Sequence, residues 1–190
     1  MKDKKTPLKF WLFAATTMFA FATPTISCAA QTIECHANQD YFIASKAYDE
    51  EPGSLFSVTI LKGATAPKIC RFDPKKADFI IGKKGEPLWF EKLDGDLLIL
   101  TRSTGPDGDL VIYNLKKRKS VLDVPADDYK IENKQIVFWQ REKSGTTANC
   151  PAFEKNEENG LSSTIVAQKI FDTLTGVVRD TGKTRCDTTQ

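Results

Sequence analysis

The sequence predicts an all-β protein: antiparallel meanders of about four strands, in a propeller-like or sandwich arrangement within a single domain. Amphipathic helical periodicity is scarce, whereas short apolar or alternating runs recur along the chain. Gly, Asp, Asn and Pro separate these runs, and these residues favour turns. Only the segment 44–51, ASKAYDEE, is expected to form a helical turn of any length.

Residues 1–30 have the features of a secretory signal peptide. Residues 1–9 carry four lysines and one acid, and residues 10–22, FWLFAATTMFAFA, carry no charge. A basic start before a short apolar core is typical of such a peptide, and a span of the bilayer would need about 20 residues. Small residues precede a cleavage point after Ala30, which leaves 31–190 as the mature all-β domain. Two alternatives stay open: retention as an anchor, or a lipoprotein whose first residue is Cys28.

Twelve segments of the mature chain have the composition of β-strands. They are residues 41–45, 56–62, 68–72, 79–81, 87–93, 96–103, 109–115, 120–124, 129–133, 135–142, 163–173 and 176–182. Residues 87–124 form four consecutive strands whose two middle members are apolar on both faces, as expected of strands covered on both sides. Residues 129–182 form a second meander and 41–81 a third, less regular one. Such units resemble the blades of a β-propeller, but three are too few for a closed propeller, so an open array, a sandwich and a small barrel stay open.

Asp-Gly-Asp occurs twice, at 94–96 and 107–109, each time before apolar residues. Asp-Gly is among the strongest hairpin signals, and Pro106 favours a turn at the second copy. A calcium loop needs further oxygen ligands at alternating positions and a terminal glutamate. Leu97 and Leu110 follow directly instead. We therefore expect turns, and no metal site, at Asp94, Asp96, Asp107 and Asp109.

Five cysteines would leave one thiol unpaired in an exported protein. Cleavage or lipidation accounts for Cys28, and four remain, which allow three pairings. We expect Cys35 with Cys70 and Cys150 with Cys186, because the two loops are then similar in size, and each bridge stabilises the fold by at most about 4 kcal/mol on the loop-entropy model. Free thiols or a zinc site are the alternative, but scattered single cysteines lack the paired spacing of zinc sites, and export exposes them to an oxidising compartment.

The mature chain is close to electrically neutral. Removing the leader's four lysines and one aspartate from the 27 basic and 25 acidic residues leaves 23 and 24. A nucleic-acid partner would require a concentrated basic surface, so none is expected. The basic run at 116–119, KKRK, lies between two strand-like segments, where a solvated hairpin tip explains it better than an anion site.

The sequence offers little sign of catalysis. His36, the single histidine, follows Cys35, and a Cys/His nucleophilic pair would need a free thiolate, which a disulfide-bonded cysteine lacks. No nucleophile elbow, zinc-protease, phosphate-loop or Gly-rich cofactor motif is present, so we expect no cofactor. Adjacent acids such as Asp127 and Asp128 are usually solvated on a turn and give a glycosidase little support.

Residues 143–163, KSGTTANCPAFEKNEENGLSS, form a long stretch without strand character. A structureless segment of about 20 residues is uncommon inside a compact domain and is often functional. Cys150 would tether its middle to Cys186, so that less ordering entropy is lost on binding. The alternative is an irregular surface insertion with no role. The predicted binding residues are Phe153, Glu154, Glu157 and Glu158.

In its leader, disulfides, size and all-β meanders, the chain resembles small periplasmic immunity proteins and lysozyme inhibitors. The resemblance implies a periplasmic or secreted protein that acts by surface contact on another protein, such as an enzyme of the bacterial envelope. Membrane contact is expected only if Cys28 is lipidated. A structural or assembly subunit of the envelope is the second hypothesis, and a small secreted hydrolase is the third.

Overall fold

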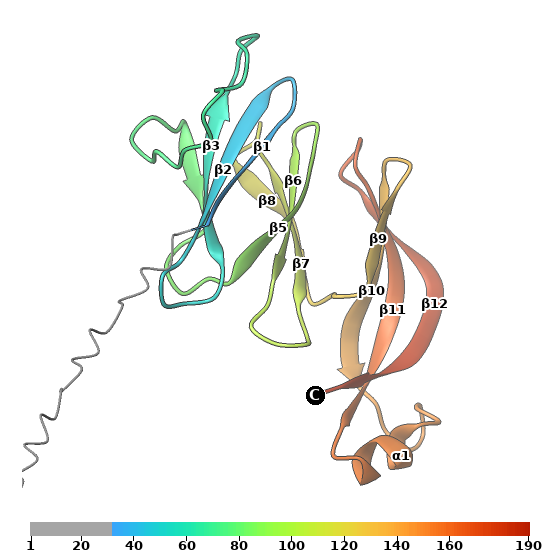
Figure 1. The fold of residues 1–190 in the computed structure, drawn as a ribbon. Coiled ribbons are helices and arrows are strands. Elements are labelled where there is room, and N and C mark those ends of the chain that lie inside the picture. The colour runs from blue at the N-terminus through green and yellow to red at the C-terminus, as the bar shows by residue number, and fades with distance from the viewer. Residues whose placement is uncertain (1–31) are drawn as a thin grey trace, which may run out of the picture. The chain divides into compact units, whose positions relative to one another are not determined.

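The computed structural model describes residues 32–190, and these belong to one compact unit. The predicted leader and Cys28 lie outside the described residues. The described chain forms twelve strands and one short helix. The strands build three antiparallel four-stranded sheets (Figure 1). The all-β fold predicted from the sequence is confirmed.

Each sheet is a meander in which strands that follow one another along the chain pair with one another. The first sheet contains β1 (Ile33–Ala37), β2 (Tyr41–Ala47), β3 (Ser54–Ile60) and β4 (Phe79–Ile81). The second contains β5 (Leu88–Asp94), β6 (Leu97–Arg102), β7 (Asp109–Asn114) and β8 (Lys119–Val124). The third contains β9 (Tyr129–Glu132), β10 (Gln135–Ser144), β11 (Ser162–Asp172) and β12 (Val178–Thr189). The three predicted meanders are therefore confirmed.

The second sheet is buried on both faces, as its two apolar middle strands predicted. Leu98 of β6 packs against Phe56 in the core shared with the first sheet. The next residue, Ile99, points the other way and packs against Phe138 in the core shared with the third sheet. All four side chains are fully buried. Burial of each contributes about 1.5–3 kcal/mol. Because successive side chains of β6 point to opposite faces, this strand packs against the first sheet on one face and against the third sheet on the other.

The outer face of the first sheet is covered by residues 61–78, which we call the strap. Phe72 of the strap packs against the buried Phe42 of β2, and Cys70 is bonded to Cys35 of β1. The prediction of a strand at 68–72 is therefore wrong. The disulfide draws this segment across the face of the sheet, where its backbone cannot pair with a strand edge. The first sheet instead reaches four strands through β1, which the sequence pattern did not predict.

The helix lies elsewhere than expected. Residues 44–47 belong to β2 and 49–51 form bends, whereas the helix is α1 (Phe153–Glu158). Ala44 is fully buried beside Phe42, so packing of the sheet outweighs local helical tendency here. The segment 143–163 is correspondingly not structureless.

The predicted turns are confirmed in place. β5 ends at Asp94 and β6 begins at Leu97, so Gly95 and Asp96 are the two corner residues. Gly95 alone of these two has a positive φ, 55°, which matches a type II′ hairpin rather than one with two positive angles. The basic run supplies the last three residues of the turn 115–118 and the first residue of β8.

Candidate functional site

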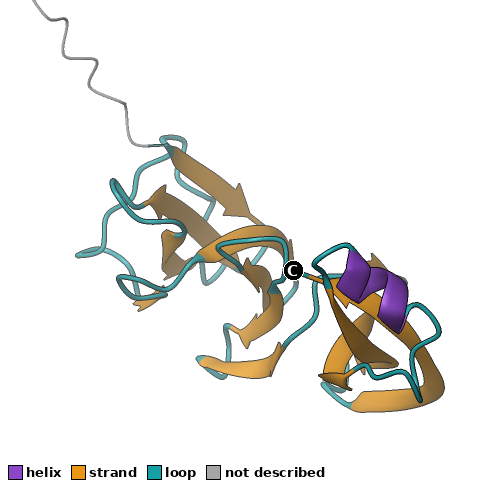
Figure 2. Cartoon of the chain, turned by 90° about the horizontal axis from the view of Figure 1, so that it is seen from below, coloured by secondary structure: helices purple, strands orange, loops and turns teal. Residues whose placement is uncertain are grey.

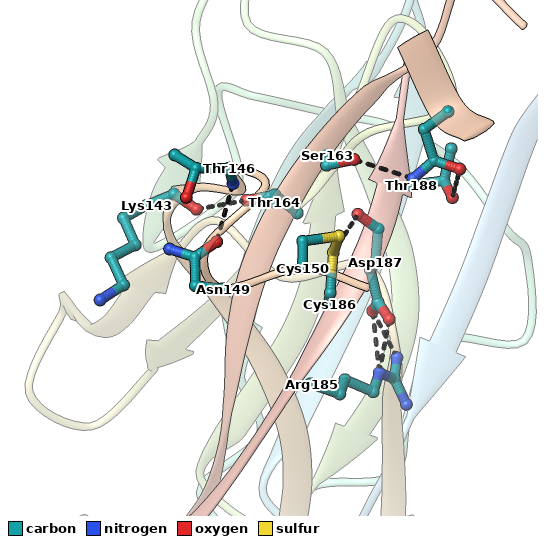
Figure 3. Close-up of a disulfide and its surroundings, with 11 residues drawn as sticks. Lys143, Thr146, Asn149, Cys150, Ser163, Thr164, Arg185, Cys186, Asp187 and Thr188 are labelled. Carbon is teal, nitrogen blue, oxygen red and sulfur yellow. Dashed lines mark hydrogen bonds and ion pairs between the residues drawn. A yellow bond between two sulfur atoms is a disulfide. The ribbon is translucent and has the colours of Figure 1, made fainter. Parts of the chain in front are cut away.

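The candidate site is the segment between β10 and β11, residues 145–161, which we call the helical loop. It contains the predicted binding residues and includes α1, which lies beside the strands of the third sheet (Figure 2). Both predicted disulfides are confirmed, and one of them, Cys150–Cys186, ties this loop to β12 with a Cα–Cα distance of 5.4 Å (Figure 3). The loop is therefore covalently fixed near its middle.

Buried polar contacts fix the loop at a second point. Asn156 of α1 is 8% exposed, and its Nδ2 donates to Ser163 Oγ of β11 at 2.8 Å. The Thr188 hydroxyl donates to Asn156 Oδ1 at 3.5 Å. Because a buried amide costs free energy unless it is paired, these bonds favour one position of α1 against β11 and β12.

At its first residue, Gly145, the helical loop passes very close to Ser163 of β11 and to Cys150. The Gly145 N–H donates to the Ser163 carbonyl at 2.8 Å, and a Cβ at this position would lie 2.8 Å from Ser163 Cβ and 3.2 Å from Cys150 Cβ. The next turn closes when Asn149 Oδ1 accepts from the Thr146 N–H at 2.7 Å (Figure 3). A residue without a side chain is thus required where the loop passes over β11.

α1 is short because its end is specified by Gly160, which has a φ of 71°. The Gly160 N–H donates to the Glu157 carbonyl at 2.9 Å, and the Leu161 N–H donates to the Asn156 carbonyl at 2.9 Å. This pair of bonds is the Schellman motif that closes many helices. The start of the helix has no side-chain cap, since Ala152 occupies that position.

The structure brings three of the four predicted binding residues to one exposed helical face. Glu154, Glu157 and Glu158 are exposed, and their spacing of three and four residues places them together. Among the described residues, these carboxylates have no hydrogen bond or ion pair to a side chain. Phe153 differs, because it is half-buried and only part of its ring is open to a partner. The binding role of the four residues stays a prediction.

His36 lies on β1, far along the chain from this loop. Its ring stacks on Phe90 with centroids 3.5 Å apart, and its Nε2 is buried without a hydrogen-bond partner. Burial lowers the pKa of His36, while Glu34, 3.9 Å away, acts in the opposite direction. Cys35 is in a disulfide. His36 therefore has neither a thiolate neighbour nor an orienting hydrogen bond at Nε2.

Of the four aspartates weighed as metal ligands, three engage side chains of the chain itself. Asp96 accepts from the Tyr41 hydroxyl at 3.0 Å, and burial, with this bond second, raises the pKa of Tyr41 to about 12. Asp94 lies 3.7 Å from the Lys92 ammonium. Asp109 accepts from Arg102 at 3.0 Å. Within residues 32–190 there is no group of three or more His, Cys, Asp or Glu side chains that could hold a metal ion.

A series of arginine–carboxylate contacts lies along the second and third sheets and was not predicted from the sequence. Arg102 binds Asp123 through two nitrogens, at 2.9 and 2.6 Å, as well as Asp109. Arg141 pairs with Asp127. In these pairs the partners lie 7 to 21 residues apart in sequence. No local motif joins them, so only the register of the strands could reveal them.

Arg185 of β12 ends this series and lies next to the helical loop. It binds Asp187 through three contacts and Asp128 at 2.7 Å. Its guanidinium carbon lies 4.1 Å from the centre of the Trp139 ring. The contacts with Asp128 and Trp139 hold β12 at the residue before Cys186, so the strand that anchors the loop is itself fixed.

Comparisons of the chain with protein-family models, with curated proteins and with solved structures found no match. The resemblance to periplasmic inhibitors therefore stays an expectation from sequence. In the part of the chain that the structure describes, no helix has the length and apolar character needed to cross a membrane.

Proposed function

We propose that this protein is an exported binding protein that acts by surface contact with another protein, as an inhibitor or immunity protein for an enzyme of the bacterial envelope. The observation that carries the proposal is the helical loop: a short helix fixed by a disulfide and by a buried amide, with three carboxylates on its open face. No cofactor or metal is needed for such a role.

A fixed loop favours binding because ordering costs are already met in the free protein. Immobilising a flexible side chain or loop on association costs about 0.5–1.5 kcal/mol per long side chain. Here Cys150 and Asn156 hold the backbone of the loop before any partner arrives. Only the side chains at its surface have to be ordered.

The charges of α1 favour a basic partner. Glu154 and Glu158 stand one helical turn apart, and like charges at this spacing destabilise a helix by about 0.2–0.5 kcal/mol. A lysine- or arginine-rich surface on the partner would remove this repulsion and accelerate association at low salt. Two disulfides also fit an oxidising compartment, which supports export to the periplasm or medium, with lipidation at Cys28 as the other route.

Affinity capture tests this proposal. The oxidised protein would be immobilised and exposed to a periplasmic extract, and the bound protein identified by mass spectrometry. We expect one enzyme in stoichiometric amount, inhibited by the added protein. Glu157→Lys with Glu158→Lys should weaken the complex at least about tenfold without lowering Tm, whereas the matched control, Glu50→Lys with Glu132→Lys at two other exposed acids, should bind like the wild type. Equal affinity of the two double variants would remove the helical loop from the binding surface.

The second hypothesis, an assembly subunit, depends on open strand edges, and β12 forms such an edge. This edge carries charges at Arg179, Asp180 and Lys183, and its pairing with β11 shifts register between Ala167 and Lys169. Charges and bulges are the usual means of preventing edge-to-edge association. A monodisperse monomer in light scattering at high concentration would reject this hypothesis.

The third hypothesis, a secreted hydrolase, rests on His36, the only histidine in the chain. A hydrolytic activity that survives His36→Ala unchanged would leave this hypothesis without its general base.

A further inference from the structure

A cavity of about 320 Å³ lies between the outer face of the first sheet and the strap. Phe42, Ser57 and Thr59 of β2 and β3 line it on the side of the sheet, and Pro67 and Ile69 line it from the strap. Cavities that bind small molecules span about 300–1,000 Å³. The cavity is thus large enough for a ligand and is part of neither shared core.

The cavity has an apolar interior that the strap does not fill. The core between the strap and the sheet has three buried side chains, Phe42, Ala44 and Leu61, and partly buried ones pack around them. Ile69 lines the cavity yet is 72% exposed, which leaves a large aliphatic side chain in water beside an apolar hollow. Transfer of such surface out of water is favourable by about 25 cal/mol per Å², so an apolar ligand would gain from covering it.

The charged side chains that line the cavity are two cations and one carboxylate. Arg71 lines it and makes no hydrogen bond or ion pair with any described residue. Lys76 also lines it, and its Nζ lies 3.9 Å from Asp73 while the side chain is 83% exposed. Asp73 is further engaged by the backbone N–H of Lys75 at 3.2 Å. One carboxylate therefore faces two cations, and the guanidinium is the group left to bind an anion.

The strap is held in place at its middle and at its C-terminal end, where it leads into β4. The Cys35–Cys70 bridge joins it to β1 with a Cα–Cα distance of 5.7 Å. At its end, the Asp78 N–H donates to the Val58 carbonyl, and the Asp78 carboxylate accepts from the Ile60 N–H, both at 2.8 Å. The cavity walls are thus fixed independently of any ligand.

We propose that this cavity binds a small anionic amphiphile: its apolar chain lies between Phe42 and Ile69, and its acidic head group pairs with Arg71. The inference rests on one cavity that combines an apolar lining with an unpaired guanidinium, which together match the chain and the head group of such a ligand. The site is separate from the helical loop and opposite to it in charge, so it adds a ligand to the proposed protein contact and does not depend on it.

The test compares decanoate with decan-1-ol, which has the same chain without the charge, by isothermal titration calorimetry on the oxidised protein. Decanoate should bind with a dissociation constant below about 1 mM. Arg71→Glu should weaken decanoate about fivefold or more and leave decan-1-ol unchanged. The matched control is Lys68→Glu, at an exposed strap residue that does not line the cavity, and it should bind both ligands like the wild type.

A second variant tests the apolar wall. Ile69→Asn should weaken both ligands, and it should fold normally because the side chain is already exposed. No binding of decanoate at millimolar concentration would overturn the proposal. So would equal affinity for the two ligands, or equal losses in Arg71→Glu and Lys68→Glu.

Discussion

The close approach at Gly145 makes the helical loop sensitive to a single methyl group. In Gly145→Ala the new Cβ would lie 2.8 Å from Ser163 Cβ and 3.2 Å from Cys150 Cβ. Neither neighbour can easily move, because Ser163 belongs to β11 and Cys150 is bonded to Cys186 on β12. The loop must therefore shift as a whole, or the bond from the Gly145 N–H to the Ser163 carbonyl must lengthen.

Overpacking of this kind costs about 1–3 kcal/mol. For a domain of this size, each kcal/mol lowers Tm by about 2–4 °C, so we expect Gly145→Ala to melt about 2–12 °C below the wild type. Calorimetry or circular dichroism of the oxidised protein measures this directly. Chemical denaturation should show the same loss of unfolding free energy with an unchanged dependence on denaturant.

Two controls decide whether the reasoning holds. A Cβ added at Gly105 would meet no heavy atom within 4 Å, and this glycine has no positive φ, so Gly105→Ala should change stability by less than about 0.5 kcal/mol. When Cys150 and Cys186 are both replaced by serine, the loop is free to move, and the cost of Gly145→Ala should shrink in a double-mutant cycle. A Tm equal to the wild type, or the same cost in both backgrounds, would refute the steric explanation.

Three further predictions concern stability. The pKa of Tyr41 is raised to about 12, first by burial and then by its bond to Asp96, so the folded state keeps a proton that the unfolded chain loses near pH 10; stability should fall as pH rises from about 10 toward 12, and urea titrations should show a smaller fall in Tyr41→Phe. Arg102→Met should cost about 1 kcal/mol at low ionic strength and less in high salt, which thermal melts at two salt concentrations would measure. Asn156→Ala leaves the buried Ser163 hydroxyl without its donor, so it should cost about 1–2 kcal/mol and accelerate hydrogen exchange in α1 relative to β11; unchanged exchange would contradict the anchoring role of this amide.

The strand pattern of the sequence predicted the fold well where one face or both faces of a strand are buried. Leu97 to Leu100 alternate between two cores, and their unbroken apolar run is the expected result. The pattern failed at the margins of the first sheet. Residues 68–72 have strand composition but cross the sheet, while β1 is short and carries Glu34 and His36, so its apolar content was too low to predict a strand.

The sequence predicted where the candidate site lies, but it did not predict the secondary structure or the contacts of that site. The missing strand pattern and Cys150 pointed to residues 143–163, and the pairing with Cys186 was predicted from loop size. The six-residue helix was not, because it is less than two turns long and lacks a side-chain cap. Its position depends on Asn156 meeting Ser163 and Thr188, which come together only when β11 and β12 pair.

Local chemistry thus determined what each segment becomes: strands from alternating apolar residues, corners from Asp-Gly, and two bridges from four cysteines. These features act over a few residues, or through the simple statistics of loop closure, and so can be read without coordinates. Tertiary structure decided what the segments face. The unpaired guanidinium above an apolar hollow and the arginine–carboxylate contacts arise from residues distant in sequence, whose approach depends on sheet register and side-chain packing. The acidic face of α1 is local in sequence, but its outward orientation depends on the packing of Asn156 against β11 and β12.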